Sequence, residues 1–563
     1  MLQDLYTLSG EQLQGTPWRE YPRPQMKRDS YVNLNGWWEF TAAWEMPTHY
    51  DKKIQVPFCP ESLLSGIHQH FEEGIGLYYR RNFSLPENFN RGRVLLHIGA
   101  ADQKAEVYVN HKRVGSHCGG YTAFTLDITE TLQDENELVI CCTDDLTSTR
   151  LPYGKQTLNR GGMWYTPVSG IWQSVWLESV PRDYIQTLKI ENRGSVVTVS
   201  IEPKLEGCVN FEGKSYPLES GAVTITPENP RFWSPEDPYL YTFAVKTKED
   251  TVDSYFALRT LEIKKVAGIP RLCLNGKPYF FHGLLDQGYW PDGIYTPATP
   301  DEYTKDILAV KELGFNMLRK HIKVEPEWFY YQCDKLGMVV FQDMVNNGKY
   351  SFFRDTALPT VGIQKWDDRK FHPDAETRRE FLQTMAATVS QLRNHPSIVY
   401  WTIFNEGWGQ FDADAVYAEL RQLDDTRFID STSGWFRRNC TDVESLHIYF
   451  GSWSKVKKYD KPLVLSEFGG YAYPVEGHLF NPDKAYGYKS CKSLEEFQRD
   501  LKKLYEEKVI PSVKKGLCAA VYTQVSDVED EINGLLTYDR KVCKAKLLDM
   551  EEIARKLTEA IKE

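Results

Sequence analysis

The sequence has little of what marks membrane-bound or secreted proteins. It contains no run of about 20 apolar residues, the length that a membrane-spanning helix requires, so we expect no membrane partner. Met1 to Gly10 lacks the basic start and apolar stretch of a secretory signal. The 11 cysteines show no paired short spacings apart from the adjacent Cys141 and Cys142, which is typical of reduced thiols rather than a disulfide framework. These absences predict a cytoplasmic protein.

Positive charge is also in deficit, with 67 basic against 78 acidic side chains and a net charge of -11. Because nucleic-acid binding favours a basic surface, we expect no nucleic-acid partner. No glycine-rich dinucleotide turn, zinc-ligand spacing or phosphate-binding loop is present. A cluster at His68, His70, Glu72 and Glu73 has chelating residue types, but a solvated turn explains it better. We therefore expect no bound metal and no cofactor.

What is present is a long chain of ordinary soluble composition, and 563 residues predict several domains. Short alternating runs separated by Gly, Asn, Asp and Pro fill the first part, which predicts a β jelly roll over residues 1–182. A second β-rich stretch, 183–265, fits an immunoglobulin-like β-sandwich. Residues 266–563 alternate apolar runs with amphipathic segments and predict a (β/α)8 TIM barrel.

The barrel prediction depends on the number of strands and helices after residue 272. The predicted strands are Tyr279–Leu284, Phe315–Leu318, Met338–Phe341, Ile398–Phe404, Phe428–Ser431, Ser445–Tyr449, Leu463–Ser466 and Leu517–Thr523. The predicted helices are Pro300–Leu313, Glu325–Leu336, Ala375–Arg393, Ala413–Asp424 and Ser493–Glu507. An open doubly wound sheet is the weaker alternative, because no glycine-rich turn follows any strand.

Two glutamates follow predicted strands directly. Glu406 comes after the fourth strand and Glu467 after the seventh, and active groups of such barrels lie at the carboxyl ends of strands. Glycoside hydrolysis needs a pair of carboxyl groups, one to protonate the leaving oxygen and one to attack or to activate water. Either glutamate alone has an equally good structural explanation as a helix cap or an arginine partner. Together, at these positions, they predict a catalytic pair.

Five segments resemble glycoside hydrolase family 2, which holds β-galactosidases, β-glucuronidases and β-mannosidases. Trp401–Trp408 (WTIFNEGW) and Leu465–Tyr471 (LSEFGGY) are similar to its acid/base and nucleophile motifs. Asn33–Phe40 (NLNGWWEF) and Tyr165–Gln173 (YTPVSGIWQ) are similar to its jelly roll, and Leu274–Pro278 (LNGKP) to the entry of its barrel. The resemblance covers nearly the whole chain. It implies a retaining exo-β-glycosidase that needs no cofactor.

The resemblance also implies roles for individual residues. Glu406 would act as general acid and then general base, and Glu467 as the nucleophile that forms a covalent glycosyl-enzyme. Asn405 would hydrogen-bond the 2-hydroxyl of the sugar. Arg319 and His321 resemble the family's Arg and His after strand two, although the usual spacing is one residue longer.

Further substrate-binding candidates stand at other predicted strand ends. His447 and Tyr449 end the sixth strand, and Tyr449 is expected to hydrogen-bond Glu467. Asp286 follows the first strand, where either a sugar contact or a plain turn would explain it. Trp435, like the pair Tyr289 and Trp290, is a candidate to stack on a sugar ring. At strand eight the family often has Trp, whereas this chain has Tyr522-Thr-Gln524.

The sugar is the least determined feature. β-Glucuronidases of the family carry an Asn-x-Lys element after strand eight. The corresponding stretch of this chain, Tyr538–Lys541, has no asparagine. A neutral sugar, with galactose first, is therefore the prediction, and a β-glucuronide, β-galacturonide or β-mannoside is the alternative. A carbohydrate-binding protein without catalysis and an endo-acting cellulase-like barrel are the other interpretations. The expected partners are a small carbohydrate or glycoconjugate substrate and, as is common in the family, further copies of the chain in a homo-oligomer.

Overall fold

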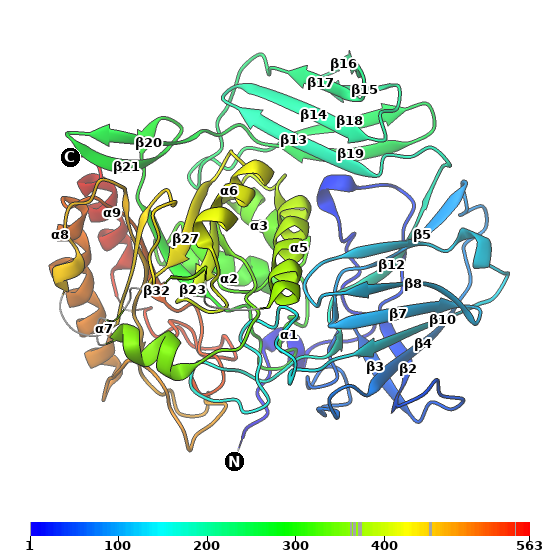
Figure 1. Ribbon diagram of the computed structural model, residues 1–563, viewed down its shortest axis with the longest axis horizontal. Coiled ribbons are helices and arrows are strands. Elements are labelled where there is room, and N and C mark those ends of the chain that lie inside the picture. Colours follow the sequence, from blue (N-terminus) through cyan, green and yellow to red (C-terminus); the bar gives the residue numbers. More distant parts are fainter. Residues whose placement is uncertain are drawn as a thin grey trace.

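The computed structural model describes residues 2–360, 363, 367–369, 374–449, 453–546 and 548–562. Figure 1 shows two β domains and a barrel: the jelly roll in blue and cyan, the sandwich in cyan-green, and the barrel from green to red. The predicted multidomain architecture is confirmed. The predicted boundary at 182 falls in the connection between strands β12 (Val175–Val180) and β13 (Thr187–Arg193). The one at 265 falls inside a hairpin, β20 (Leu261–Val266) with β21 (Ile269–Leu274).

The jelly roll consists of two facing antiparallel sheets. One has the order β3 (Lys52–Val56), β2 (Gly36–Ala43), β4 (Gly76–Phe83), β10 (Asn136–Thr143), β7 (Lys104–Val109), β8 (Lys112–Cys118). The other has β1 (Val32–Asn33), β12, β5 (Arg93–Ile98) and β9 (Phe124–Asp127), and β6 (Ala101–Asp102) pairs with β11 (Gly170–Ile171). Strand β7 alternates exposed Lys and Glu with buried Ala105, Val107 and Val109, because successive side chains point to opposite faces.

The sandwich packs a three-stranded sheet on a four-stranded one. The first is β13, β14 (Val196–Glu202) and β17 (Ala222–Ile225); the second is β16 (Lys214–Pro217), β15 (Gly207–Phe211), β18 (Tyr241–Thr247) and β19 (Thr251–Phe256). Two of its side chains tie it to the barrel. Arg259 donates to the carbonyl oxygens of Pro396 (2.7 Å) and Ile398 (2.9 Å), and Tyr255 Oη donates to Asp334 Oδ2 at 2.7 Å.

The barrel has the eight parallel strands that the sequence predicts. They are β23 (Phe281–Asp286), β24 (Met317–Lys320), β25 (Val339–Asp343), β26 (Ile398–Asn405), β27 (Phe428–Ser433), β28 (Glu444–Ile448), β29 (Leu463–Gly469) and β32 (Leu517–Thr523). Seven pairs of neighbouring strands are hydrogen-bonded in parallel, in the order β27, β26, β25, β24, β23, β32, β29, β28. The ring nearly closes where the backbone N–H of Asp442 donates to Ile429 O at 3.0 Å. All eight residues of β26 are buried, as expected for a parallel strand covered on both faces.

The predicted helices are present within a few residues. They are α2 (Asp301–Glu312), α3 (Glu327–Leu336), α5 (Ala375–Leu392), α6 (Ala413–Leu423) and α7 (Leu494–Leu504), with α9 (Met550–Ala560) after the last strand. The predicted helix Ser493–Glu507 ends sooner, because the segment Tyr505–Val509 winds as a π-helix. Local signals define several ends: Asp374 caps α5 by accepting from the backbone N–H of Thr377, and Gly337 (φ 72°) ends α3 in the left-handed region.

One connection of the jelly roll, residues 144–169 between β10 and β11, leaves its own domain and lies on the barrel. Tyr153 Oη donates to Gly348 O at 2.8 Å, Arg160 Nη1 pairs with Asp530 at 2.9 Å, and Tyr165 Oη donates to Glu531. We call these residues the docking loop. It brings side chains of the first domain to the carboxyl ends of the barrel strands.

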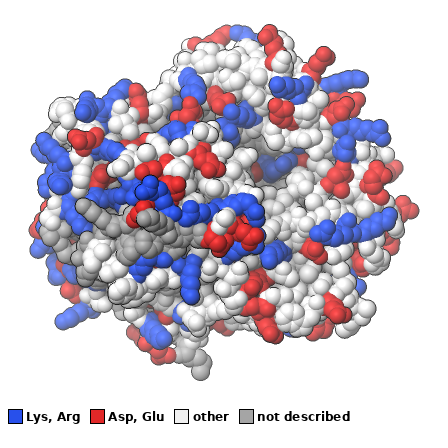
Figure 2. All heavy atoms as spheres, in the orientation of Figure 1, with Lys and Arg blue, Asp and Glu red and all other residues white. Residues whose placement is uncertain are grey.

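The surface carries both signs of charge. On the face drawn in Figure 2, Lys and Arg are interspersed with Asp and Glu over all three domains, and the coloured atoms show no extended basic area. None of the described helices combines the length and the apolar character that crossing a membrane would take.

Candidate active site

The two predicted glutamates converge at the carboxyl ends of the barrel strands. Glu467 lies within β29 and is 5% exposed; Glu406 follows β26 directly and is 9% exposed. Glu406 has a φ of 52°, a conformation that is costly for a residue with a Cβ and that clusters at functional sites. Its backbone N–H donates to Ser433 O at 2.9 Å, which holds the turn. A carboxylate oxygen of Glu406 lies within 4.8 Å of one of Glu467.

Arg319 organises the floor of the site. Its guanidinium donates to Glu467 Oε1 (3.1 Å), to Asn405 Oδ1 (2.9 Å) and to Asp343 Oδ1 (3.0 Å). The side chain is only 1% exposed, so it acts behind the carboxylates rather than at the surface of the pocket. Burial by itself would raise the pKa of Glu467, but the charges of His447 and Arg319 outweigh it and lower that pKa to about 2. Glu467 is therefore ionised at neutral pH, as a nucleophile must be.

His447 connects the two carboxylates. Its Nδ1 lies 2.7 Å from Glu406 Oε1 and 3.6 Å from Glu467 Oε2, while Nε2 lies 3.0 Å from Ser433 Oγ. The ring has no exposed surface. In this position His447 orients Glu406, and its assignment to substrate binding stays a prediction. The side chains of Glu406, His447 and Glu467 are also of the types that bind a metal ion, but the Arg319 guanidinium already supplies a positive charge beside Glu467.

Tyr449 makes the predicted contact with Glu467. Its Oη donates to Glu467 Oε2 at 2.5 Å and lies 2.9 Å from Thr523 Oγ1 at the end of β32. The ring stacks on Tyr488, with centroids 3.6 Å apart and planes at 11°. The stack fixes the hydroxyl at the one oxygen of Glu467 that Arg319 does not hold.

Replacing Tyr449 with phenylalanine should lower kcat/KM by about 10- to 100-fold, the loss typical of a hydrogen bond to a charged group. The ring and its stack on Tyr488 remain, so the melting temperature should change little. Steady-state kinetics of the two proteins on one aryl β-glycoside, with circular dichroism melts, measure both effects. An unchanged kcat/KM would show that the hydroxyl does not support the nucleophile.

The remaining predicted residues lie at different depths. His321 Nδ1 is 2.7 Å from Asp343 Oδ2, and burial lowers the pKa of His321 to about 4, so the ring is neutral at pH 7. Trp435 packs edge-on against His447, with centroids 5.6 Å apart, at the side of the site.

Two predicted elements lie away from the carboxylates. Asp286 accepts from Lys320 Nζ at 2.6 Å, in a buried cluster with Glu325 outside the barrel interior. The structure therefore does not bring Asp286 to the catalytic pair, because alternate residues of a strand face opposite sides. Tyr289 and Trp290 are 2% and 1% exposed and belong to the core, so they do not form a wall of the pocket.

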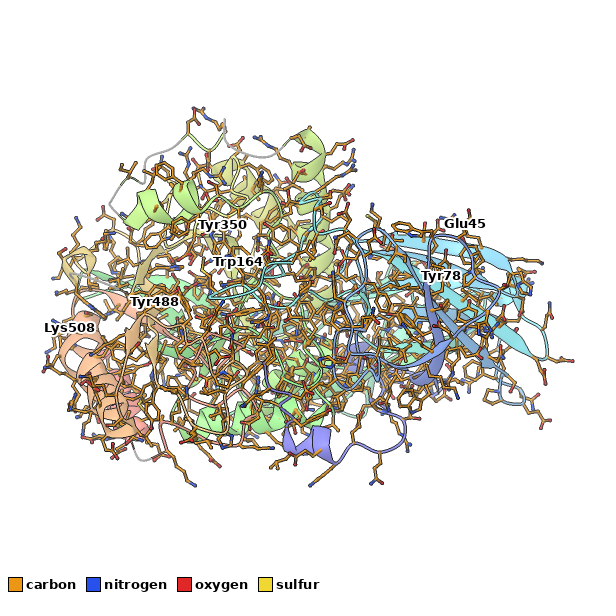
Figure 3. All side chains as sticks on the ribbon, turned by 90° about the horizontal axis from the view of Figure 1, so that it is seen from below. Glu45, Tyr78, Trp164, Tyr350, Tyr488 and Lys508 are labelled. Carbon is orange, nitrogen blue, oxygen red and sulfur yellow. The ribbon has the colours of Figure 1, made fainter. Side chains whose placement is uncertain are left out.

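Sequence reasoning missed an aromatic rim that the docking loop completes. Trp164 stacks on Trp408 at 5.2 Å and packs against Tyr350 at 4.8 Å. Figure 3 labels Trp164, Tyr350 and Tyr488, which lie over the barrel half of the molecule, far from Tyr78 of the jelly roll. Trp408 stood in a quoted motif, and Trp164 comes directly before another. Their meeting depends on how two domains dock, which no local pattern encodes.

The segment after β32 also differs from the expectation. Residues Tyr538–Lys541, the stretch compared with Asn-x-Lys, make contacts elsewhere: Asp539 pairs with His478 and Lys541 with Glu11. Instead, Glu531 lies beside the docking loop and accepts from Asn533 Nδ2 at 2.9 Å. Gln524 Nε2 in turn donates to Asn533 Oδ1 at 2.8 Å. This chain of polar residues stands where the family's strand-eight Trp was expected.

A barrel with paired carboxyl groups at its strand ends, preceded by two β domains, defines a multidomain glycoside hydrolase fold. The family model described as "Glycosyl hydrolases family 2, TIM barrel domain" matches residues 265–558. The "Glycosyl hydrolase 2 galactose-binding domain-like" model matches 53–159, and "Glycosyl hydrolases family 2" matches 184–259. The chain belongs to glycoside hydrolase family 2.

Relatives with different names resemble this chain equally well. It is 24% identical over 461 residues to a putative β-glucuronidase of Formosa agariphila, covering 72% of this chain and 52% of that one. It is 24% identical over 475 residues to a β-galactosidase of Thermoanaerobacter pseudethanolicus (76% and 59%) and 25% over 507 residues to human β-glucuronidase (76% and 72%). The chain thus spans little more than half the length of the first two relatives.

Solved structures share the fold over nearly the whole chain. The β-D-glucuronidase of Dictyoglomus thermophilum superposes with a TM-score of 0.73 at 20% identity, covering 95% of this chain and 98% of that one. A β-galacturonidase of Eisenbergiella tayi superposes with a TM-score of 0.68 at 17% identity, covering 95% and 98%.

Proposed function

We propose that the protein is a retaining exo-β-glycosidase in which Glu406 is the acid/base and Glu467 the nucleophile. The observation that carries the proposal is the separation of their carboxylate oxygens, which is within 4.8 Å. Retaining glycosidases hold the two carboxyl groups about 5–5.5 Å apart, whereas inverting ones leave about 6.5–9.5 Å for a water molecule. The distance leaves no room for that water between Glu467 and the sugar.

In the first step the ionised Glu467 attacks the anomeric carbon while Glu406 gives its proton to the glycosidic oxygen. A bond forms between Glu467 and the sugar, and the bond to the leaving alcohol breaks. Arg319 and Tyr449 hold Glu467 through both of its oxygens and set its direction of attack.

In the second step Glu406, now ionised, takes a proton from water as the water attacks the anomeric carbon and releases Glu467. His447, 2.7 Å from Glu406 Oε1, keeps that carboxylate in one orientation for both proton transfers. Asn405 accepts from Arg319 through its oxygen, so its NH2 is the group that donates to the sugar 2-hydroxyl.

The docking loop supports exo action. Trp164 from the jelly roll and Tyr350 and Trp408 from the barrel form a wall beside Glu406, which suits a pocket that admits a chain end rather than an open groove. The partly exposed rings of Trp164 and Tyr350 suit a sugar ring, whose C–H groups stack on aromatic faces.

For the sugar we propose a neutral β-glycoside, with β-galactoside first. The second candidate is a β-uronide, which the names of the human and Dictyoglomus thermophilum relatives favour. A binding protein without catalysis is a weaker candidate, because both carboxylates keep the hydrogen bonds that orient them.

A panel of 4-nitrophenyl β-glycosides (galactoside, glucuronide, galacturonide, mannoside, glucoside and fucoside) tests the activity and names the sugar. For the substrate that is cleaved, proton NMR of the first product should show the β anomer, because two displacements restore the configuration. An α anomer appearing first would contradict the covalent mechanism. Sugar binding by a protein that cleaves none of the panel would favour the binding-protein interpretation.

A further inference from the structure

Lys155 of the docking loop is a largely buried lysine whose ammonium lies over the ring of Trp408. The residue is 6% exposed, and its Nζ lies 4.9 Å from the ring centroid of Trp408 and 6.0 Å from that of Tyr165. Among the residues that the structure describes, this Nζ has neither a hydrogen bond nor an ion pair within 4.0 Å. Because an unpaired buried charge is costly, this side chain needs an explanation other than stability.

The ammonium lies close enough to the catalytic carboxylates to interact with them electrostatically. Burial lowers the pKa of Lys155, and the nearby charges of Glu531, Glu467 and Glu406 oppose that effect. In the other direction, Lys155 helps to depress the pKa of His321. Trp408, whose ring lies 4.9 Å from the Nζ, follows Glu406 by only two residues in the chain.

Attachment of the docking loop does not require Lys155. Arg160 pairs with Asp530 at 2.9 Å and with Glu529 at 3.5 Å, and the backbone N–H of Thr166 donates to Glu529 at 2.8 Å. These contacts match the acidic residues after β32 with partners from the loop. The Lys155 charge is therefore surplus to docking.

Glu531 is the carboxylate with the largest attraction for Lys155, yet the two form no ion pair. Glu531 is 2% exposed and is held by Tyr165 Oη and by Asn533 Nδ2 at 2.9 Å. Burial raises its pKa. Both groups lie at Tyr165: Lys155 Nζ is 6.0 Å from the centroid of its ring, and the Glu531 carboxylate accepts from its hydroxyl. The donor and the acceptor are thus near each other but more than 4.0 Å apart, and an oxygen atom between them would satisfy both.

We propose that Lys155 and Glu531 form a recognition subsite for one hydroxyl of the sugar, with Lys155 donating to it and Glu531 accepting from it. This inference rests on the proposed glycosidase function and gives its substrate class as neutral sugars. Neither residue is among those that sequence reasoning assigned to the site.

The charge balance favours a hydroxyl over a sugar carboxylate. A uronate would add a negative charge near Glu531, Glu467 and Glu406. Arg319 is already paired with Glu467, so Lys155 would have to balance the added charge. Like charges that lie close together in a buried site repel one another. A hydroxyl adds no charge, and a site built to hydrogen-bond it rejects analogues that lack it.

The test compares wild-type protein with Lys155→Met and Glu531→Gln, each close in size to the residue replaced. Lys104→Met, at an exposed position of β7, is the matched control. We expect kcat/KM on the preferred neutral glycoside to fall by about 10- to 100-fold in both variants and to stay unchanged in the control. Monodeoxy glycosides identify the hydroxyl: the one that Lys155 binds should be equally poor for wild type and for Lys155→Met.

Binding provides a readout independent of turnover. In a Glu467→Gln background, tryptophan fluorescence titrations with galactose and galacturonate, and with glucose and glucuronate, should show at least about 10-fold tighter binding of the neutral sugar than of its uronate. Lys155→Met should weaken the binding of the neutral sugar by about 10-fold or more. Selective loss of uronate binding or cleavage in Lys155→Met would overturn the proposal in favour of a carboxylate site. Unchanged kinetics and binding in both variants would also overturn it, while activity of the wild type would leave the glycosidase proposal standing.

Discussion

Glu467→Gln is expected to lower kcat/KM by at least about 10,000-fold on every β-glycoside that the wild type cleaves, because it removes the covalent nucleophile. Glutamine has the same shape but neither the charge nor the nucleophilicity to attack an anomeric carbon. The pKa of about 2 makes the wild-type residue an anion throughout the neutral range. Initial rates with an aryl β-glycoside measure the loss.

The variant should still fold, because Arg319 keeps its partners Asp343 and Asn405. Circular dichroism melts, with Glu559→Gln on the exposed end of α9 as the control, separate loss of chemistry from loss of structure. With a slow substrate, mass spectrometry of the wild type should find a glycosyl adduct on the peptide that contains Glu467. Residual activity within tenfold of the wild type would remove Glu467 from the mechanism.

Glu406→Ala is expected to divide substrates by their leaving groups. An alkyl β-glycoside, whose departing oxygen needs a proton, should lose about 100- to 10,000-fold in kcat/KM, the usual contribution of a general acid. A 2,4-dinitrophenyl β-glycoside needs no such help, so its kcat/KM should fall much less. Its kcat should fall strongly, because the second step lacks its base and the glycosyl-enzyme accumulates as a burst.

Sodium azide should restore turnover of that variant. The truncated side chain leaves space on the face from which water attacks, and azide needs no base, so the product should be the β-glycosyl azide. Wild type with azide is the control and should form none. Equal losses on alkyl and dinitrophenyl substrates, without rescue, would contradict the assignment of Glu406 as acid/base.

Much of the barrel could be predicted because its signals are local. Buried parallel strands appear as continuous apolar runs such as Ile398–Phe404, and the helices between them show caps such as Asp374 and Ser493. Element ends were predicted less well. The last predicted helix contains a π-helical segment over Tyr505–Val509, and nothing in its periodicity distinguishes that winding from an α-helix.

The site was predicted in part for the same reason. Glu406 and Glu467 follow strands directly, so their place at the carboxyl ends was visible, and Tyr449 was matched to Glu467 through the family resemblance. His447 was placed at the correct strand end, but its contact with Glu406 was not foreseen, because the sequence does not show which groups cover its ring. The pairing of Asp286 with Lys320 was not foreseen, because strand position does not tell which face of the barrel a terminal residue joins.

By itself the sequence determined the three-part architecture, the family and the place of Glu406 and Glu467 at strand ends, because each of these follows from residues close together in the chain. Tertiary structure alone decided that those carboxylates come within 4.8 Å, that Trp164 meets Trp408, and that Lys155 lies over the Trp408 ring. Those pairs join segments from different strands or domains. Their distances depend on how the barrel closes and how the docking loop packs on it, and no local pattern of residues encodes such a distance.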